Sequence, residues 1–170
     1  PAPGSTVPDL ACGDGGLGPH LMRRGLRYRG ADATSAMVDA ARLAVPDAAG
    51  FEVGTIDDYA PPAPVDVTTL FRALYYATDR EAFFGRAAAY TRGKLVFDLD
   101  PRRFDLPTVV AELRSAGLER VATRPFFVPQ TSALPRPALA LLRGLERVPY
   151  VTDAVLRRRF TVIVAAWHGG

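Results

Sequence analysis

Cysteine, histidine and lysine are nearly absent from this sequence. Its 170 residues contain one cysteine, two histidines and one lysine, Lys94. A lone cysteine has no partner for an internal disulfide, and one cysteine with two histidines is too few for the common structural zinc sites. We therefore expect a protein of a reducing compartment that holds no structural metal.

Long apolar runs are also missing. No segment approaches the ~18–20 apolar residues of a membrane span, and residues 1–8 lack the charged and apolar regions of a signal peptide. These two absences favour a cytoplasmic location.

Basic residues exceed acidic ones, with a formal net charge of +3 and a pI of about 9.4. The arginines form only two short clusters, at residues 23–29 and 157–159. Neither cluster is interleaved with the aromatic residues of an RNA-binding sheet. We therefore interpret both as solvated surface arginines and expect no nucleic-acid partner.

The length suits one domain, and 48% hydrophobic with 23% charged residues is typical of a globular protein. Short apolar segments alternate with longer segments of helical period, which predicts an α/β fold with a parallel sheet. The strands are expected at residues 6–11, 28–31, 50–53, 65–71, 94–99, 118–126 and 160–167. The helices are expected at residues 16–24, 35–43, 79–90, 106–116 and 137–146.

A connection of more than thirty residues separates the last two predicted strands. Residues 126–159 contain several prolines around one apolar stretch of helical period, and so long a connection is usually functional or mobile. We expect a lid over an apolar bound molecule or a peripheral membrane contact through residues 134–159, unless the segment is a helix packed on the sheet. Residues 1–170 are otherwise expected to form a single domain.

A glycine-rich turn follows the first predicted strand and opens the first predicted helix. Gly13, Gly15 and Gly18 satisfy the G-x-G-x-x-G spacing, and glycines allow a tight turn with close backbone approach to a ligand. Asp32 ends the second predicted strand, where a carboxylate can accept hydrogen bonds from both hydroxyls of a ribose. The order of these elements predicts a nucleoside-bearing cofactor at the carboxyl edge of the sheet.

The same glycine spacing also occurs in nicotinamide-dependent enzymes, so an NAD-dependent oxidoreductase is an alternative. Asp9 argues against it, because a carboxylate four residues before Gly13 repels a pyrophosphate. An acid at this position suits a cofactor that carries positive charge.

These residues resemble the class I S-adenosylmethionine-dependent methyltransferases. Asp9, Ala11, Gly13 and Gly15 match the family's first motif, and residues 30–37 resemble its second, in which the acid holds the ribose. The resemblance implies a Rossmann-like, doubly wound, seven-stranded sheet that is mostly parallel, with an antiparallel seventh strand. It assigns S-adenosylmethionine binding to Asp9, Ala11, Gly13, Gly15, Asp32, Ala33, Met37, Ile56, Asp57 and Phe71.

The sequence departs from the family pattern at three places. Pro8 lies within the first strand, where proline cannot donate to the ladder, so the start of that strand should be displaced or unpaired on one side. Thr55 stands where the family has an acid near the adenine, and Asp57 is expected to substitute for it or else to cap a turn. We also expect this chain to lack the helices that precede the first strand in the family. A non-catalytic, truncated binding module is therefore a second alternative.

Methyl transfer is an in-line displacement that needs positioning more than catalytic side chains. Where the acceptor is a hydroxyl or an ammonium, a base must take its proton. Asp100, at the end of the fifth strand, is the predicted base, unless it caps the following turn, and Tyr75 is predicted to line the acceptor pocket. His20, His168 and Cys12 are expected to be structural or surface residues. The predicted function is methylation of a small-molecule acceptor at O, N or C.

Overall fold

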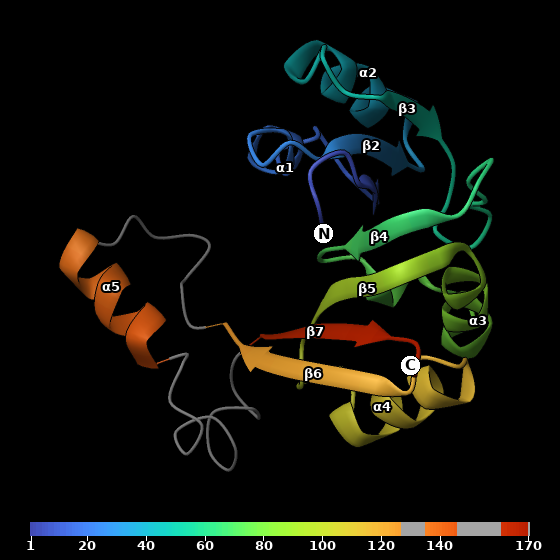
Figure 1. The fold of residues 1–170 in the computed structure, drawn as a ribbon, viewed down its shortest axis with the longest axis vertical. Helices are drawn as coiled ribbons and strands as arrows, with labels where there is room; N and C mark the ends of the chain where they lie inside the picture. Colours follow the sequence, from blue (N-terminus) through green and yellow to red (C-terminus); the bar gives the residue numbers. More distant parts are fainter. Residues whose placement is uncertain (127–134, 146–160, 170) are drawn as a thin grey trace.

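The computed structural model describes residues 1–126, 135–145 and 161–169. In these residues one seven-stranded sheet has the order β3-β2-β1-β4-β5-β7-β6 (Figure 1). The strands are β1 (Thr6–Leu10), β2 (Arg27–Asp32), β3 (Gly50–Val53), β4 (Val65–Leu70), β5 (Thr91–Leu99), β6 (Arg120–Pro125) and β7 (Val162–Trp167).

Five α-helices and one short 3₁₀ helix connect these strands. They are α1 (Gly18–Met22), α2 (Ser35–Ala44), η1 (Leu74–Tyr76), α3 (Arg80–Tyr90), α4 (Leu106–Ser115) and α5 (Arg136–Leu145). Each predicted strand and helix is present, and most ends lie within three residues of the expected ones. The largest shortening is at α1, which ends at Met22 before the turn at Gly25.

The seventh strand runs against the others, as predicted. Strands β1 to β5 pair in parallel, whereas β7 lies between β5 and β6 and is antiparallel to both (Figure 1). In this register Phe97 faces Val164. The α/β class and the mostly parallel sheet are therefore confirmed.

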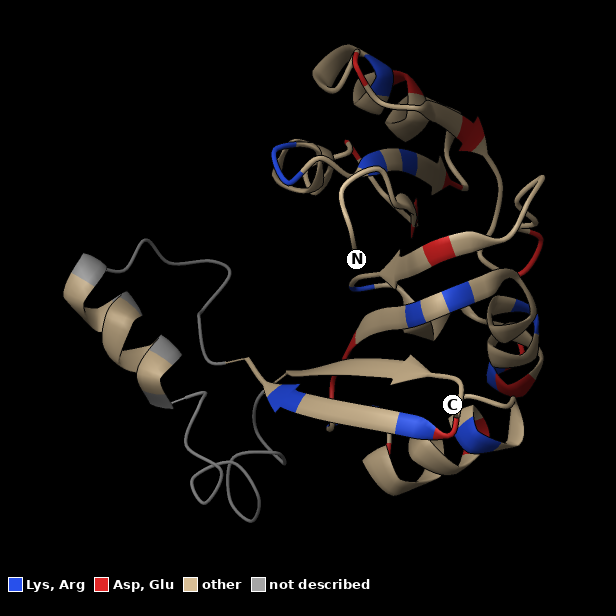
Figure 2. Ribbon diagram, viewed as in Figure 1, with Lys and Arg blue, Asp and Glu red and all other residues tan. Residues whose placement is uncertain are grey.

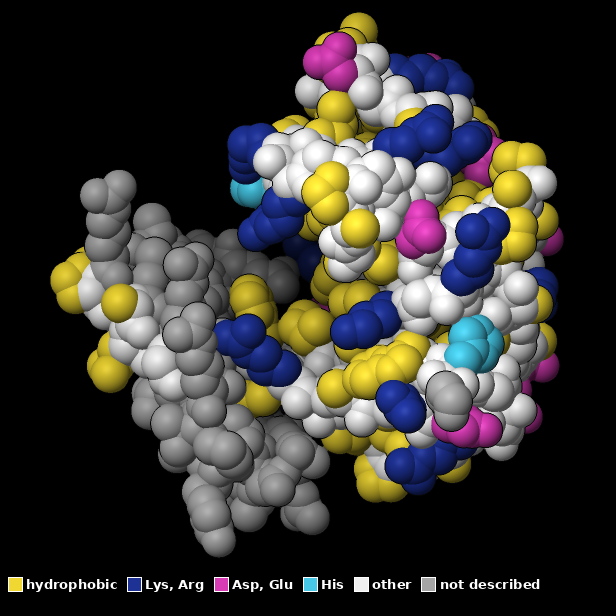
Figure 3. Space-filling model, viewed as in Figure 1, with side chains coloured by type: hydrophobic (Ala, Val, Ile, Leu, Met, Phe, Trp, Pro, Cys, Tyr) yellow, Lys and Arg dark blue, Asp and Glu magenta, His cyan; other side chains and the backbone are white. Residues whose placement is uncertain are grey.

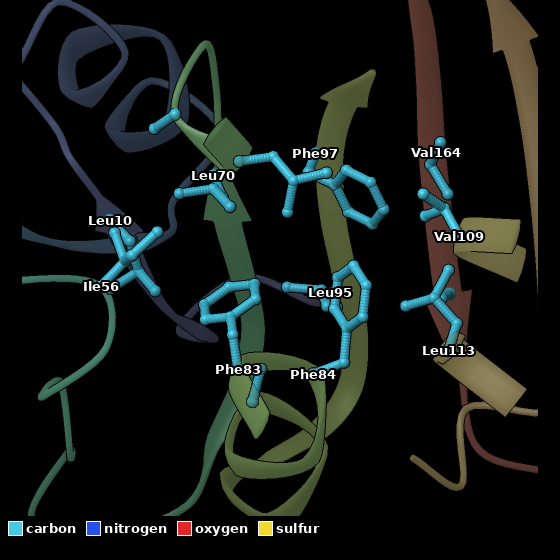
Figure 4. Packing of buried hydrophobic residues seen from close by; sticks show 14 of the residues in the cluster. Leu10, Ile56, Leu70, Phe83, Phe84, Leu95, Phe97, Val109, Leu113 and Val164 are labelled. Atoms are coloured by element: carbon cyan, nitrogen blue, oxygen red, sulfur yellow. The ribbon is translucent and has the colours of Figure 1, made fainter. Parts of the chain in front are cut away.

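One face of the sheet holds the main hydrophobic core, beneath α3 and α4. Leu95 and Phe97 alternate with outward neighbours along β5 and are fully buried. Phe84 of α3 contacts Phe97 with ring centroids 5.6 Å apart, and Leu113 reaches the same core from α4 (Figure 4). Burying such side chains contributes roughly 1.5–3 kcal/mol each, so this face is a major source of stability.

The helices α1 and α2 lie over the opposite face, at the β2 side of the sheet. Tyr28 of β2 is fully buried there, with its ring edge against Phe51. A Cβ on Gly18 would come within 2.8 Å of the Tyr28 ring, so the start of α1 can pack this closely only with glycine. Helices therefore cover both faces, as the doubly wound prediction requires.

Pro8 limits pairing at the start of β1, as predicted. On the β2 side all five residues of β1 pair, whereas on the β4 side the pairs are Asp9 with Thr69 and Leu10 with Leu70. The N–H of Thr6 instead donates to the Asp66 side chain at 2.8 Å. A side-chain acceptor thus replaces the missing ladder partner.

Gly93 lies inside β5 because this strand begins at Thr91, three residues earlier than expected. The register of β5 against β4 shifts nearby, and a Cβ on Gly93 would lie 2.2 Å from the backbone oxygen of Asp66. We expect Gly93→Ala to lower the free energy of unfolding by about 2 kcal/mol or more, since the added methyl group forces the backbones of β4 and β5 apart. Urea denaturation measures this. Gly85→Ala is the control, because open space surrounds Gly85 in α3; equal stability of Gly93→Ala and the parent would contradict the packing described.

The long connection between β6 and β7 lies largely outside the described residues. Within it the structure describes Phe126 and residues 135–145, and α5 stands apart from the sheet in Figure 1. Leu141 on this helix is 66% exposed. The predicted lid and peripheral membrane contact therefore stay untested. Among the described helices, none is long and apolar enough to cross a membrane.

Candidate functional site

The carboxyl ends of β1 to β4 open into a cavity of about 1250 Å³. Parallel strands present their carboxyl ends at one edge, which is where ligands bind in open α/β sheets. This volume exceeds the roughly 300–1,000 Å³ of a pocket for one drug-sized ligand. There is therefore room for a cofactor and a second small molecule.

The loop after β1 has an unusual backbone. Ala11 and Gly13 have φ values of +53° and +55°, in the left-handed region that costs a non-glycine residue roughly 1–2 kcal/mol. The N–H of Gly13 donates to Asp32 Oδ2 at 2.9 Å, and a Cβ on Gly13 would meet no atom within 4 Å. Since Gly13 lines the cavity, any side chain added there would have no protein neighbour to pack against.

Asp9 lies under this loop and is 4% exposed. Its carboxylate accepts hydrogen bonds from Thr69 Oγ1 at 2.8 Å and from the Tyr28 hydroxyl at 3.1 Å. Burial raises the pKa of Asp9 to about 6, although these two donors partly offset the effect. The carboxyl is therefore a group that titrates just below neutral pH at the floor of the cavity.

Asp32 ends β2 and joins two loops. Besides the Gly13 N–H, its carboxylate accepts from the N–H of Thr34 at 3.0 Å. Each carboxylate oxygen keeps a second acceptor direction, because an ionised carboxylate has about four lone-pair sites. Asp32 can therefore bind a ligand while it fixes the glycine loop. Ala33 and Met37, which follow it, also line the cavity.

The loop after β3 contributes Ile56, Asp57 and Asp58 to the lining. Asp57 accepts from the N–H of Thr78 at 3.0 Å and from Arg86 at 3.2 Å. Burial opposes ionisation of Asp57, but these donors outweigh it and lower its pKa. Thr55 instead donates to Asp58 at 2.6 Å. Asp57 thus ties this loop to α3, a role beyond the two that the sequence suggested.

The end of β4 contributes Phe71, Arg72, Tyr75 and Tyr76. Arg72 has a φ of +57°, and its N–H donates to Asp98 of β5. The two tyrosines are 47% and 63% exposed with ring centroids 4.3 Å apart, whereas Leu74 between them and the strand is buried. This end of the cavity is aromatic and basic.

Ten of the twelve predicted site residues line the cavity, and Gly15 and Asp100 are not among the lining residues. A Cβ on Gly15 would meet Val45 at 3.1 Å, so this glycine serves the turn and its packing. Asp100 Oδ1 accepts from the N–H of Arg102 at 2.9 Å, which is the turn-capping role considered from the sequence. Its role as a base stays a prediction.

The remaining polar candidates have structural contacts. Both ring nitrogens of His168 face backbone oxygens, of Gly117 on one side and of Ala88 and Thr91 on the other. His20 lies on α1 beside Arg23. Cys12 lines the cavity, and burial raises the pKa of its thiol to about 12, which keeps it protonated. The described residues contain no cluster of ligands that could hold a metal ion.

Sequence reasoning missed several contributors to the site. Tyr28 and Thr69 hold Asp9 from neighbouring strands, and Arg72 lines the β4 end of the cavity. The signal for Arg72 was its position directly after the fourth strand, next to the predicted Phe71. Pairing across strands, which brings Tyr28 and Thr69 to Asp9, leaves no local mark in the sequence.

The strand order with a reversed seventh strand, and a cavity at the carboxyl ends, are the features of the Rossmann-like fold of S-adenosylmethionine-dependent methyltransferases. The comparisons agree with this class. A family model described as "Methyltransferase domain" matches residues 7–93, about half of the chain. The chain belongs to this methyltransferase family, and its cofactor is S-adenosylmethionine. No curated protein matches the sequence significantly.

Solved structures share the fold at low sequence identity. A chain of the complex between the Haloferax volcanii Trm112 methyltransferase activator and its candidate methyltransferase is 22% identical, with a TM-score of 0.72 over 99% of this chain and 84% of that one. A TehB-like methyltransferase from Corynebacterium glutamicum is 15% identical, with a TM-score of 0.71 over 99% and 82%. The magnesium protoporphyrin IX methyltransferase of Synechocystis is 17% identical, with a TM-score of 0.64 over 97% and 71%.

Proposed function

We propose that this protein methylates a small-molecule acceptor, with S-adenosylmethionine at the β1–β3 side of the cavity and the acceptor at the β4 side. The observation that carries the proposal is the cavity itself, whose volume of about 1250 Å³ has room for both molecules. Its walls are made by the carboxyl ends of adjacent strands, and such a concave site suits a small acceptor.

The residues present fit the cofactor. S-adenosylmethionine carries a sulfonium and an ammonium, and Asp9, Asp14 and Asp32 supply negative charge at the β1 and β2 ends. The open space beside Gly13 leaves the backbone accessible for the methionine part. Asp32 is proposed to accept from the ribose hydroxyls, and Ile56 with Met37 to flank the adenine. A pyrophosphate would meet these same carboxylates, which disfavours NAD.

The bound cofactor supplies an electrophilic methyl group, and the chain's own residues align the acceptor with it at ~3–3.5 Å and exclude water. Phe71, Tyr75 and Tyr76 are proposed to form the acceptor wall. For an acceptor that must lose a proton, Asp100 stays the predicted base. The cytoplasmic location also stays a prediction.

A nucleic-acid acceptor has less support. Lys and Arg lie on β2, β5 and β6 in separate positions rather than along one edge (Figure 2). On the face drawn in Figure 3 they are interspersed with hydrophobic and uncharged groups. Over the described residues of this face there is no continuous basic groove of the kind that tracks a phosphate backbone. The test is methyl transfer from labelled S-adenosylmethionine to a metabolite panel, beside RNA and protein acceptors. Label in metabolites alone supports the proposal; label in RNA or protein alone would overturn it.

The titration of Asp9 predicts how cofactor binding depends on pH. Because the folded-state pKa of about 6 lies above the ordinary 3.8, the stability contributed by Asp9 is present below about pH 3.8 and is lost as pH rises through about 6. Over the same interval Asp9 gains the negative charge that attracts the cofactor. We expect the affinity for S-adenosylmethionine to rise about tenfold from about pH 5 to about pH 7.5, while the Asp9-linked stability falls.

Calorimetric titrations at these two pH values measure the affinity, and urea denaturation measures the stability. The Asp9→Asn variant keeps the shape of the side chain without its charge, so both pH dependences should flatten. An unchanged affinity slope in Asp9→Asn would show that another group controls cofactor binding.

A further inference from the structure

Charge is divided along the cavity. The lining at the ends of β1, β2 and β3 contains carboxylates. Arg86 also lines the cavity there, and its guanidinium is paired with Asp57. At the end of β4 the lining changes to Arg72 with two tyrosines, and Asp79 at the start of α3 also lines this side. The carboxylates therefore lie mainly at the β1–β3 ends, and the positive charge at the β4 end comes from Arg72.

Arg72 occupies a backbone conformation that disfavours it. Its φ of +57° lies in the left-handed region, where glycine would be less strained, and the bond from its N–H to Asp98 holds this conformation. Strained non-glycine residues of this kind cluster at ligand sites. The residue is exposed, and within the described part of the chain its guanidinium makes no hydrogen bond or close ion pair, although its charge acts on the Asp98 carboxylate. Its five donors are thus available to a ligand.

A second arginine reaches the same place from β5. The guanidinium of Arg103, in the turn after that strand, lies 5.0 Å from the centre of the Tyr75 ring. Arg72 also acts electrostatically on the Tyr75 hydroxyl. One aromatic wall is therefore flanked by two positive charges. This arrangement repels an ammonium group and attracts an oxyanion.

We propose that the methyl acceptor carries an oxyanion group, a carboxylate or a phosphate, that binds Arg72 and Arg103 while the rest of the acceptor lies against Tyr75 and Tyr76. This inference rests on the proposed function, because it places the acceptor at the β4 end of the cavity. Arginine forks bind carboxylate and phosphate equally through paired N–H donors, so both sources share one chemistry.

The test uses four probes of similar size: benzoate, phenyl phosphate, benzyl alcohol and benzylamine. Each is titrated into the protein, with and without S-adenosylhomocysteine, and followed by NMR. We expect at least one of the anions to bind roughly tenfold more tightly than the alcohol or the amine, as charge-assisted hydrogen bonds imply. The stronger anion identifies carboxylate or phosphate as the group recognised. Equal binding of all four, or preference for benzylamine, would overturn the proposal.

The key variant is Arg72→Gly, since glycine adopts a φ of +57° without strain. We expect it to keep the midpoint of thermal unfolding within roughly 3 °C and to lose the anion preference, as should Arg103→Ala. Arg92→Ala, an exposed arginine at the opposite end of β5 and outside the cavity lining, is the matched control. Retained anion preference in both Arg72→Gly and Arg103→Ala would overturn the proposal.

S-adenosylhomocysteine separates this inference from the proposed function. Its affinity should change less than about threefold in Arg72→Gly; a loss as large as that of the anions would place Arg72 on the cofactor's carboxylate instead. If S-adenosylhomocysteine fails to bind the parent protein, the proposed function fails. The probe titrations without it still decide whether the anion site exists.

Discussion

The Gly13→Val variant should lose cofactor binding by at least about 100-fold while the protein stays folded. The Cβ of this residue would point into space that no protein atom occupies within 4 Å, on the wall of the cavity. An isopropyl group there would fill the volume that we propose for the methionine part of the cofactor. Its φ of +55° also strains any other residue, so stability should fall by roughly 1–2 kcal/mol. Calorimetric titration with S-adenosylhomocysteine and thermal unfolding of the same sample measure both effects.

Gly117 supplies the matched control. It lies between α4 and β6 with a φ of +88°, no atom within 4 Å of its Cβ position, and no place in the cavity lining. Gly117→Val should therefore lose comparable stability through the same backbone strain and keep its affinity. If Gly13→Val binds as tightly as the parent, or if both variants lose affinity equally, the glycine loop is a structural turn and not a cofactor wall.

The second large effect is expected for Asp32→Ala. We assign this carboxylate two charge-assisted hydrogen bonds to the ribose hydroxyls, worth roughly 1.5–3 kcal/mol each before water compensates. The carboxylate also holds the N–H groups of Gly13 and Thr34, so its removal loosens the glycine loop. Both losses weaken cofactor binding. An affinity decrease of about 100-fold or more is the expected result of calorimetric titration.

Asp39→Ala controls for the loss of one negative charge. Asp39 lies on α2, pairs with Arg42 at 2.9 Å and is not part of the cavity lining. Its replacement should change affinity less than about twofold, since exposed pairs contribute little. Equal affinities of Asp32→Ala and Asp39→Ala would show that Asp32 does not contact the cofactor.

The fold was predictable because its signals are local. The continuous apolar run of β7 and the apolar period of α4 are visible in the sequence, and Pro8 correctly predicted pairing restricted on one side of β1. Gly93 shows where prediction from the sequence fails. The fifth strand was expected at residues 94–99, which leaves Gly93 outside it, whereas β5 begins at Thr91. The backbone of Asp66 at a register shift leaves no room for a side chain at Gly93, and this contact has no local signal in the sequence.

The cavity residues that belong to sequence motifs could be predicted. The contacts that form only between neighbouring strands could not. Asp9, Gly13 and Asp32 belong to a spaced pattern, so their common location followed from strand order. The pKa of Asp9 depends on burial and on Thr69, sixty residues away in sequence. Arg72 and Arg103 come from different loops, and only the pairing of β4 with β5 brings both to Tyr75.

The most direct measurement is a paired calorimetric titration of the protein with S-adenosylhomocysteine and with NAD, repeated on Asp32→Ala. The account predicts one S-adenosylhomocysteine per chain, an affinity weakened about 100-fold in the variant, and no measurable binding of NAD. Binding of NAD in place of S-adenosylhomocysteine, or an S-adenosylhomocysteine affinity that Asp32→Ala leaves unchanged, would contradict it.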